Sequence, residues 1–272
     1  MGKMENRYTR ELITYYSSIG VEKFVIADNN LPGTEQFIDV VQDYINNKTV
    51  EVIDIRGKPY DYSEYYEIMY EKYSNRCDWL AFFDFNEYLV MHNDEGKNLT
   101  LQEYITNDRF GKCEAIQFNW VMTGDNDLVY YDNRPSIERF TKPNFMHSKN
   151  RYVKILARGG INKAIFKAYE SCHKPVKNVI TCNSSGKILE NHSDIISPPE
   201  VTYAYLLHFN TRTAEEYVTK VKRGYAGNRY SEYEERVELF FNLNKFTEEK
   251  LKVFEKHFNQ TFKKYHHEQL LY

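Results

Sequence analysis

The sequence predicts an α/β fold, in which a mostly parallel central sheet is flanked by helices and followed by a helical C-terminal extension. Two observations indicate this class. Short apolar runs that are typical of strands alternate with amphipathic helical segments over residues 5–90. The last of these runs, residues 79–83, leads directly into three polar residues, Asp84, Asn86 and Glu87. We therefore expect consecutive βαβ units and a polar site at the end of a buried strand.

Elements of the first ninety residues follow from the spacing of their apolar side chains. Helices are predicted where apolar residues recur every three or four positions, at residues 5–19, 34–46 and 62–73. Strands are predicted at the short apolar runs of residues 24–27, 50–55 and 79–83. The third of these strands is apolar enough to be buried on both faces. Gly20 is suited to end the first helix, and Thr34 is suited to cap the second.

After residue 90 the regular alternation of strand and helix stops. Strands are predicted at residues 115–121, 154–157 and 202–208. Helices are predicted at residues 99–105, 213–225 and 232–241, and from residue 247 onward. Residues 166–199 have the composition of a loop-rich insertion. Because no repeat or low-complexity linker interrupts the chain, we expect one domain over residues 1–226 and a helical extension over residues 227–272.

Charge and composition argue against several classes of protein. The 272 residues carry a formal net charge of −3, which is atypical of a nucleic-acid-binding surface. No apolar run approaches the roughly 20 residues that span a bilayer, and no signal peptide is visible. The cysteines lack metal-site spacing and are expected to be reduced thiols; they are Cys77, Cys113, Cys172 and Cys182. These features predict a cytoplasmic protein, with peripheral association at the inner face of a membrane as an alternative.

The polar residues after the strand at residues 79–83 are candidates for binding a cation. In an open parallel sheet, ligands bind beyond the carboxyl ends of the strands. Side-chain oxygens of Asp84, Asn86 and Glu87 at such an end can hold a divalent cation, which would neutralise a diphosphate. The alternative is that Asp84 and Glu87 form only a turn and its cap.

Two further strand ends carry candidate ligands. Asp28 and Asn29 follow the strand at residues 24–27, where a carboxylate can accept a hydrogen bond from a base or a ribose hydroxyl. Asp28 can equally well start a turn. His208 ends the strand at residues 202–208, and a neutral imidazole can complete the coordination of Mn²⁺, although a lone histidine is more often structural.

The helix predicted from residue 213 carries a group of cationic side chains, Lys220, Lys222 and Arg223. Ammonium and guanidinium groups bind phosphate oxygens through charge-assisted hydrogen bonds. The group is therefore a candidate clamp for a diphosphate. An ordinary solvated helix face is the alternative.

Short motifs occur in a fixed order along the first 226 residues. They lie at residues 5–11, 20–21, 25–30, 56–57, 78–89, 119–120, 124–126, 138–140, 207–209, 213, 216–217 and 222–224. In type and order they resemble the motifs of glycosyltransferase family 92, and more broadly those of family-2-like glycosyltransferases. The resemblance depends on the agreement of many motifs, since no single one would suffice.

This resemblance implies a fold, a reaction and its partners. The fold is GT-A, with a Rossmann-like central sheet. The reaction is transfer of a sugar, with inversion, from a nucleotide-sugar donor, expected to be a UDP-sugar. The acceptor is a glycan or a lipid-linked saccharide, in the synthesis of a cell-surface polysaccharide. The cofactor is a divalent cation, Mn²⁺ or, as the alternative, Mg²⁺.

The resemblance also assigns roles to particular residues. The nucleotide is expected at Asp28, Asn29, Asp84, Lys222 and Arg223. The metal ligands are Asp84 and Asn86, which occupy the DxD motif, and His208. The acceptor is expected beside Trp120, Gly124 and Glu87. An inverting reaction needs a carboxylate base for the acceptor hydroxyl, and the candidates are Asp125, Asp127 and Glu138.

Departures from the family pattern define an alternative function. Asn86 stands where the family has the second carboxylate of the DxD motif, and Tyr62 stands where relatives have a glutamine. Only four residues precede Glu5, where the family has a first strand. The alternative is a weakened or inactive GT-A-fold protein that binds glycan or nucleotide. A nucleotidyltransferase, a third possibility, usually has a glycine-rich loop near its start, and this sequence has none there.

Overall fold

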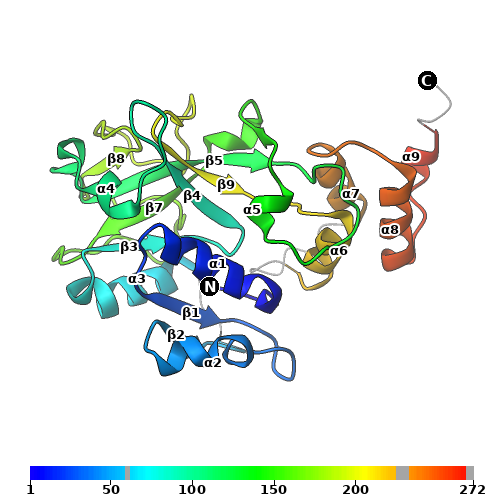
Figure 1. Cartoon of the computed structure of the whole chain (residues 1–272), viewed down its shortest axis with the longest axis horizontal. Coiled ribbons are helices and arrows are strands. Elements are labelled where there is room, and N and C mark those ends of the chain that lie inside the picture. The colour runs from blue at the N-terminus through cyan, green and yellow to red at the C-terminus, as the bar shows by residue number, and fades with distance from the viewer. Residues whose placement is uncertain (59–61, 225–232, 268–272) are drawn as a thin grey trace. The chain divides into compact units, whose positions relative to one another are not determined.

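Residues 1–58, 62–224 and 233–267 are described by the computed structural model (Figure 1). The chain forms two compact units. The first unit contains Met1–Val121 and Phe145–His208, and the second contains Met122–Asn144 and Phe209–Tyr272. Each unit is thus built from two separate stretches of chain. The predicted domain boundary after residue 226 lies outside the described residues.

A βαβ unit near the N-terminus confirms the first part of the prediction. Strands β1 (Phe24–Asp28) and β2 (Val50–Asp54) are parallel and paired in register along their whole length. Helix α2 (Ile38–Asn46) connects them, and helix α1 (Asn6–Ser18) precedes β1 (Figure 1). Gly2 forms a parallel bridge with Asp28. The segment before Glu5 therefore pairs with β1 through this bridge.

Helix α2 begins at Ile38 rather than at Thr34, so the predicted Thr34 cap is wrong. The Thr34 hydroxyl donates a hydrogen bond to the Leu31 carbonyl at 2.7 Å. The Asp28 carboxylate accepts the Phe37 N–H at 3.2 Å, which ties the segment before the helix to the end of β1. A contact made across the fold thus overrides the local preference of threonine for a cap.

The other strands form a seven-stranded sheet with the order β3-β7-β5-β9-β4, in which β6 and β8 also pair with β5. The strands are β3 (Trp79–Phe82), β4 (Glu87–Met91), β5 (Ala115–Thr123), β6 (Pro143–Asn144), β7 (Val153–Arg158), β8 (Thr181–Asn183) and β9 (Ala204–His208). The β5–β8 pair is parallel, whereas the β3–β7, β5–β7, β4–β9 and β5–β6 pairs are antiparallel.

The protein is a mixed α/β structure, but the prediction of a mostly parallel sheet is wrong beyond the first βαβ unit. Parallel neighbours need long crossover connections, which are usually helical. After β3 the connections are turns, loops and short helices, and these suit antiparallel pairing. Strand β3 lies at one end of the strand order, and the prediction that it is buried on both faces is wrong, because Ala81 is exposed.

The remaining helices are divided between the two units. The first unit contains α3 (Tyr62–Tyr73), η1 (Ser74–Arg76), α4 (Leu101–Ile105), η2 (Asp108–Phe110) and η3 (Ser148–Arg151). The second contains α5 (Ser136–Arg139), α6 (Ala214–Lys222), α7 (Tyr233–Phe241), α8 (Glu248–Phe258) and α9 (Lys263–His267). Residues 225 and 232, predicted to be helix ends, lie outside the described residues. In the described part of the chain, no helix is both long and apolar enough to cross a bilayer.

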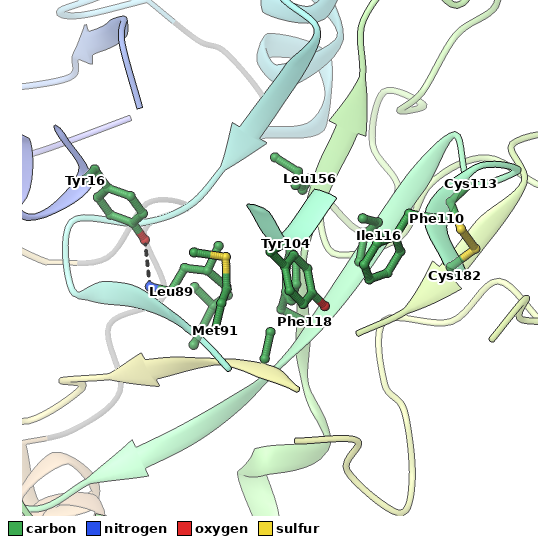
Figure 2. Packing of buried hydrophobic residues seen from close by; sticks show 12 residues of the cluster. Tyr16, Leu89, Met91, Tyr104, Phe110, Cys113, Ile116, Phe118, Leu156 and Cys182 are labelled. Carbon is green, nitrogen blue, oxygen red and sulfur yellow. Dashed lines mark hydrogen bonds between the residues drawn. A yellow bond between two sulfur atoms is a disulfide. The ribbon is translucent and has the colours of Figure 1, made fainter. Parts of the chain in front are cut away.

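A buried cluster in the first unit attaches α1 to the larger sheet (Figure 2). The Tyr16 hydroxyl of α1 donates to the Glu87 carbonyl at 2.8 Å and accepts the Leu89 N–H at 3.2 Å. Both partners belong to β4, so α1 fixes the strand that begins at the predicted polar site. The cluster includes Met91, Tyr104, Phe110, Ile116, Phe118 and Leu156.

The same cluster contains a disulfide between Cys113 and Cys182 (Figure 2). The prediction of reduced thiols is therefore wrong for this pair, whereas Cys77 and Cys172 are free. Parallel pairing of β5 with β8 places Cys182 opposite Ile116, close to Cys113. The two cysteines are 69 residues apart in sequence, so their spacing could not reveal this contact.

Candidate functional site

The predicted polar residues form a tight turn between β3 and β4. The Asp84 N–H donates to Glu87 Oε2 at 2.8 Å, and the Glu87 N–H donates to the Asp84 carbonyl at 3.1 Å. Glu87 is fully buried, whereas the Asp84 side chain is 35% exposed. Glu87 therefore closes the turn from inside, as the alternative interpretation held, and Asp84 presents its carboxylate at the surface. Asn86, between them, is largely buried.

A buried lysine that the sequence analysis missed joins this turn. Lys154 lies within β7, is 2% exposed, and donates from Nζ to Asp84 Oδ2 at 2.8 Å. Its Nζ is also 3.7 Å from Glu87 Oε1. The signal available in the sequence was a single lysine inside an otherwise apolar strand. A buried charge of that kind needs a partner of opposite charge.

The three charged groups shift one another's protonation. Burial raises the pKa of Glu87 to about 8, against the attraction of the Lys154 ammonium. Burial also acts to raise the pKa of Asp84, but Lys154 outweighs burial and holds that pKa well below its usual range; the Met1 amino group and His173 act in the same direction. Burial acts to lower the pKa of Lys154, but the attraction of Asp84 and Glu87 is the larger effect, so the pKa is raised. Both shifts favour the charged forms, in agreement with the ion pair that Asp84 and Lys154 form at 2.8 Å.

An imidazole and an indole lie on the strands beside the turn. The antiparallel register of β4 with β9 places His208 opposite Glu87. The rings of His208 and Trp120 are 4.3 Å apart between centroids, and His173 approaches Trp120 at 5.6 Å. His173 Nδ1 lies 2.8 Å from the Val153 carbonyl, next to Lys154 in sequence. The first unit thus brings together the turn of residues 84–87, His208 and Trp120.

The predicted metal ligands Asp84, Asn86 and His208 include only two side chains of the usual ligating types. Within the described ranges, no three His, Cys, Asp or Glu side chains are grouped to hold a metal ion. An amide oxygen from Asn86 would have to complete the set. The ligand types suit a divalent cation, and Lys154 already balances one negative charge beside them.

The end of β1 carries the predicted nucleoside site. Asp28 is buried, and its two carboxylate oxygens accept the N–H groups of Asn30 at 2.9 Å and Phe37 at 3.2 Å. The Asn29 N–H donates to the Gly2 carbonyl at 2.9 Å. In this structure Asp28 therefore holds a loop, which is what a turn-starting aspartate does.

Most of the other predicted residues belong to the second unit. Asp125 is buried with Lys250, whose Nζ is 2.6 Å from Asp125 Oδ2, and the Asp125 N–H donates to Asn244 Oδ1 at 2.6 Å. Burial raises the pKa of Asp125 in spite of Lys250. Asp127 and Glu138 are exposed.

Two further predictions in the second unit concern Gly124 and the basic end of α6. A Cβ on Gly124 would lie 3.1 Å from Asn244 Oδ1, so glycine allows a close approach there. Lys222 ends α6 and is exposed, and Arg223 caps that helix. Lys220, by contrast, donates to the Asn210 carbonyl and side-chain oxygen at 2.7 and 2.8 Å.

Residues of two motifs that contributed to the family resemblance, at 138–140 and 216–217, form a buried ion pair. Sequence reasoning did not predict this contact. Arg139 donates from Nη1 and Nη2 to the two carboxylate oxygens of Glu216 at 2.7 and 2.9 Å. Glu216 also belongs to the capping box of α6, in which the Thr213 hydroxyl accepts the Glu216 N–H. These motif residues therefore hold α5 and α6 together.

Comparison with curated proteins gives no match. The profile of glycosyltransferase family 92 matches residues 3–268, which is nearly the whole chain. The matched range contains the turn of residues 84–87 with His208 in the first unit and the Arg139–Glu216 pair in the second. The chain therefore belongs to glycosyltransferase family 92, and its activity class is that of a glycosyltransferase.

Proposed function

We propose that this protein transfers a sugar from a nucleotide-sugar donor, a UDP-sugar, to a growing glycan or lipid-linked saccharide. In this proposal the fold is a GT-A variant, the reaction is inverting, and the product is a cell-surface polysaccharide. The observation that carries the proposal is the position of Asp84. It is a charged, partly exposed carboxylate in the DxD turn, with His208 on the strand next to that turn, in a chain of this family.

The donor is proposed to bind with a ribose or sugar hydroxyl at Asp84, because a carboxylate accepts hydrogen bonds from hydroxyls, and its diphosphate would be held through a cation rather than by the carboxylate itself. Asp84, Asn86 and His208 would hold the cation, Mn²⁺ or Mg²⁺. When bound, that cation would neutralise charge on the departing diphosphate. Asp28 and Asn29 are proposed to lie near the nucleoside. Lys222 and Arg223 belong to the second unit, and their assignment to the phosphates stays a prediction from the sequence.

The acceptor side requires an aromatic surface and a base. Trp120 supplies an indole next to His208, and flat apolar rings suit the C–H faces of sugars. The resemblance also assigns Glu87 and Gly124 to the acceptor; Glu87 is fully buried in its turn and Gly124 belongs to the second unit, so these two assignments stay predictions from the sequence. Among the candidate bases, the exposure of Asp127 and Glu138 favours them over Asp125, because a base must reach the acceptor hydroxyl.

The test is Asp84→Ala, with Asp94→Ala as a matched loss of an exposed carboxylate in the same unit. A screen of nucleotide sugars by thermal shift, with Mn²⁺, first identifies the donor, because binding to the native state raises its apparent stability. We expect Asp84→Ala to lower turnover of that donor by about 10²–10³-fold or more, and Asp94→Ala to leave it unchanged. Wild-type turnover in Asp84→Ala would defeat the proposal.

Asn86 favours one alternative, a GT-A-fold protein that binds glycan or nucleotide with weak or no catalysis. An amide is a neutral and weaker ligand for a hard cation than a carboxylate. Calorimetry with UDP, in the presence and absence of Mn²⁺, separates the two functions. Binding of UDP that depends on the metal supports the transferase, whereas binding of glycan without nucleotide supports the alternative.

A further inference from the structure

The side chain of Lys154 is a cation within the candidate site. The proposed function, on which this inference rests, puts a divalent cation in the same site. The Lys154 ammonium is 2.8 Å from Asp84 Oδ2 and 3.7 Å from Glu87 Oε1, and the lysine side chain is 2% exposed. The lysine lies near the start of β7, which pairs with β3 on one side and with β5 on the other. The ammonium is therefore fixed by the sheet rather than carried on a mobile surface chain.

A divalent cation that binds Asp84 has to share that carboxylate with Lys154. One of the two Asp84 oxygens is occupied by the ammonium, and the cation on the other would lie a few ångströms from a like charge. Repulsion between charges at such a distance is strong in a partly buried site. The second carboxylate, Glu87, is fully buried and accepts the Asp84 N–H, so it adds no exposed negative charge.

We propose that Lys154 positions Asp84 and makes the site a poor one for a free divalent cation, so that the cation binds together with the nucleotide diphosphate. The diphosphate brings the negative charge that offsets the repulsion from Lys154. Binding of metal and of nucleotide is then strongly coupled, and each raises the affinity of the other by the same factor. Lys154 is buried and acts through Asp84, so it is a positioning residue.

The direct test measures Mn²⁺ affinity by calorimetry without nucleotide or sugar. We expect Lys154→Met to bind Mn²⁺ at least about tenfold more tightly than the wild type, because one like charge is gone. Lys154→Arg keeps the charge and should bind as weakly as the wild type. In the wild type, UDP should raise the affinity for Mn²⁺ by at least about tenfold, and in Lys154→Met by much less.

Lys250→Met is the matched control, since Lys250 is also fully buried and paired with an aspartate, in the second unit. It should lose stability as Lys154→Met does, without a change in Mn²⁺ affinity. The double variant Asp84→Ala with Lys154→Met should lose the gain in affinity, which assigns the binding to Asp84.

If Lys154→Met does not fold, Glu87→Gln is compared with Glu87→Gln plus Lys154→Met. Glutamine removes the charge of Glu87 in both proteins, so the two proteins differ only in the ammonium. A folded variant without Lys154 that binds free Mn²⁺ no more tightly than its parent would overturn the inference. That result would not change the outcome of the Asp84→Ala turnover test, which tests the proposed function. Conversely, survival of turnover in Asp84→Ala would not change the outcome of the Mn²⁺ comparison, which tests the role of Lys154.

Discussion

Asp125 shows how a residue of the right type can be placed for a structural role. It comes just after the long strand β5, at a position where a catalytic base could lie. Its carboxylate is instead bound to Lys250 in a buried ion pair. Breaking a buried pair leaves a charge without its partner and is strongly destabilising. Its neighbour Asp127 and the helix residue Glu138 are exposed instead.

Substitution of these three carboxylates separates a structural role from a catalytic one. We expect Asp125→Asn to lower the free energy of unfolding by about 3–5 kcal/mol, because Lys250 then lacks a counter-charge. Asp127→Asn and Glu138→Gln should each change it by no more than about 0.5 kcal/mol. Urea unfolding and initial rates are measured on all three variants. If Asp125→Asn keeps its stability and loses only turnover, Asp125 is the base after all.

At the scale of residues, sequence reasoning indicated the aspartate of the Asp84–Lys154 and Asp125–Lys250 pairs and missed the lysine. Asp84 was identified from its place after a predicted strand and Asp125 from the family resemblance, and each comes two residues after a strand. Asp28, identified in the same way as Asp84, is the last residue of β1. Lys154 and Lys250 were missed because contacts between distant segments depend on sheet register and helix packing. Neither of these can be read from the spacing of residues along the chain.

Helix α6 depends on contacts of two kinds at its first turn. The Thr213–Glu216 capping box is local and could be predicted from the sequence, whereas the Arg139 guanidinium comes from α5. Burial acts to raise the pKa of Glu216, but hydrogen bonds from Arg139 outweigh it, so the pKa is lowered. A carboxyl group with a lowered pKa in the folded state stabilises the protein above its unfolded pKa, and this contribution is lost as the pH falls through its folded value.

We therefore expect the wild type to lose stability below about pH 4.5, the ordinary pKa of glutamate. The double variant Arg139→Met with Glu216→Gln should lose less over the same interval, because it lacks the titrating group and keeps a residue suited to the capping box. Urea midpoints at pH 6, 5, 4 and 3 test this. Parallel decline of both proteins with pH would show that this pair does not contribute to acid sensitivity.

At the scale of elements, helices and short strands were predicted well because their signals are local. Helix α3 has the predicted bounds, α1 is one residue shorter at each end, and β1 and β2 differ by one residue at their C-terminal ends. Parallel pairing was predicted correctly for β1 and β2, which α2 joins, but not for β2 and β3, which belong to different sheets although α3 joins them. For β3 to β9 the order and direction of strands depend on which apolar faces pack together, and the sequence pattern is compatible with several arrangements.

For the whole molecule, the disulfide and the division into two units predict uneven unfolding. Cys113 and Cys182 both lie in the first unit and are 69 residues apart. Closing a loop of that length is worth about 4 kcal/mol in the chain-entropy account. We expect reduction by dithiothreitol to lower the unfolding temperature of the first unit and to leave that of the second nearly unchanged.

Thermal scans with and without reductant, followed by near-ultraviolet circular dichroism, check this prediction. A Cys77→Ser variant controls for reaction of a free thiol, since Cys77 is not in the disulfide. Equal shifts of both transitions would mean that the two units unfold as one.

The interleaved order of the two units has a consequence for the nascent chain. The first unit can close once His208 has left the ribosome, because β9 ends there. Residues 122–144 are translated earlier, yet Asp125 must wait for Lys250, which is translated much later. Asp125 therefore stays without Lys250 during elongation, when chaperones can reach it, and a translational pause after β9 would let the first unit mature before the second is complete.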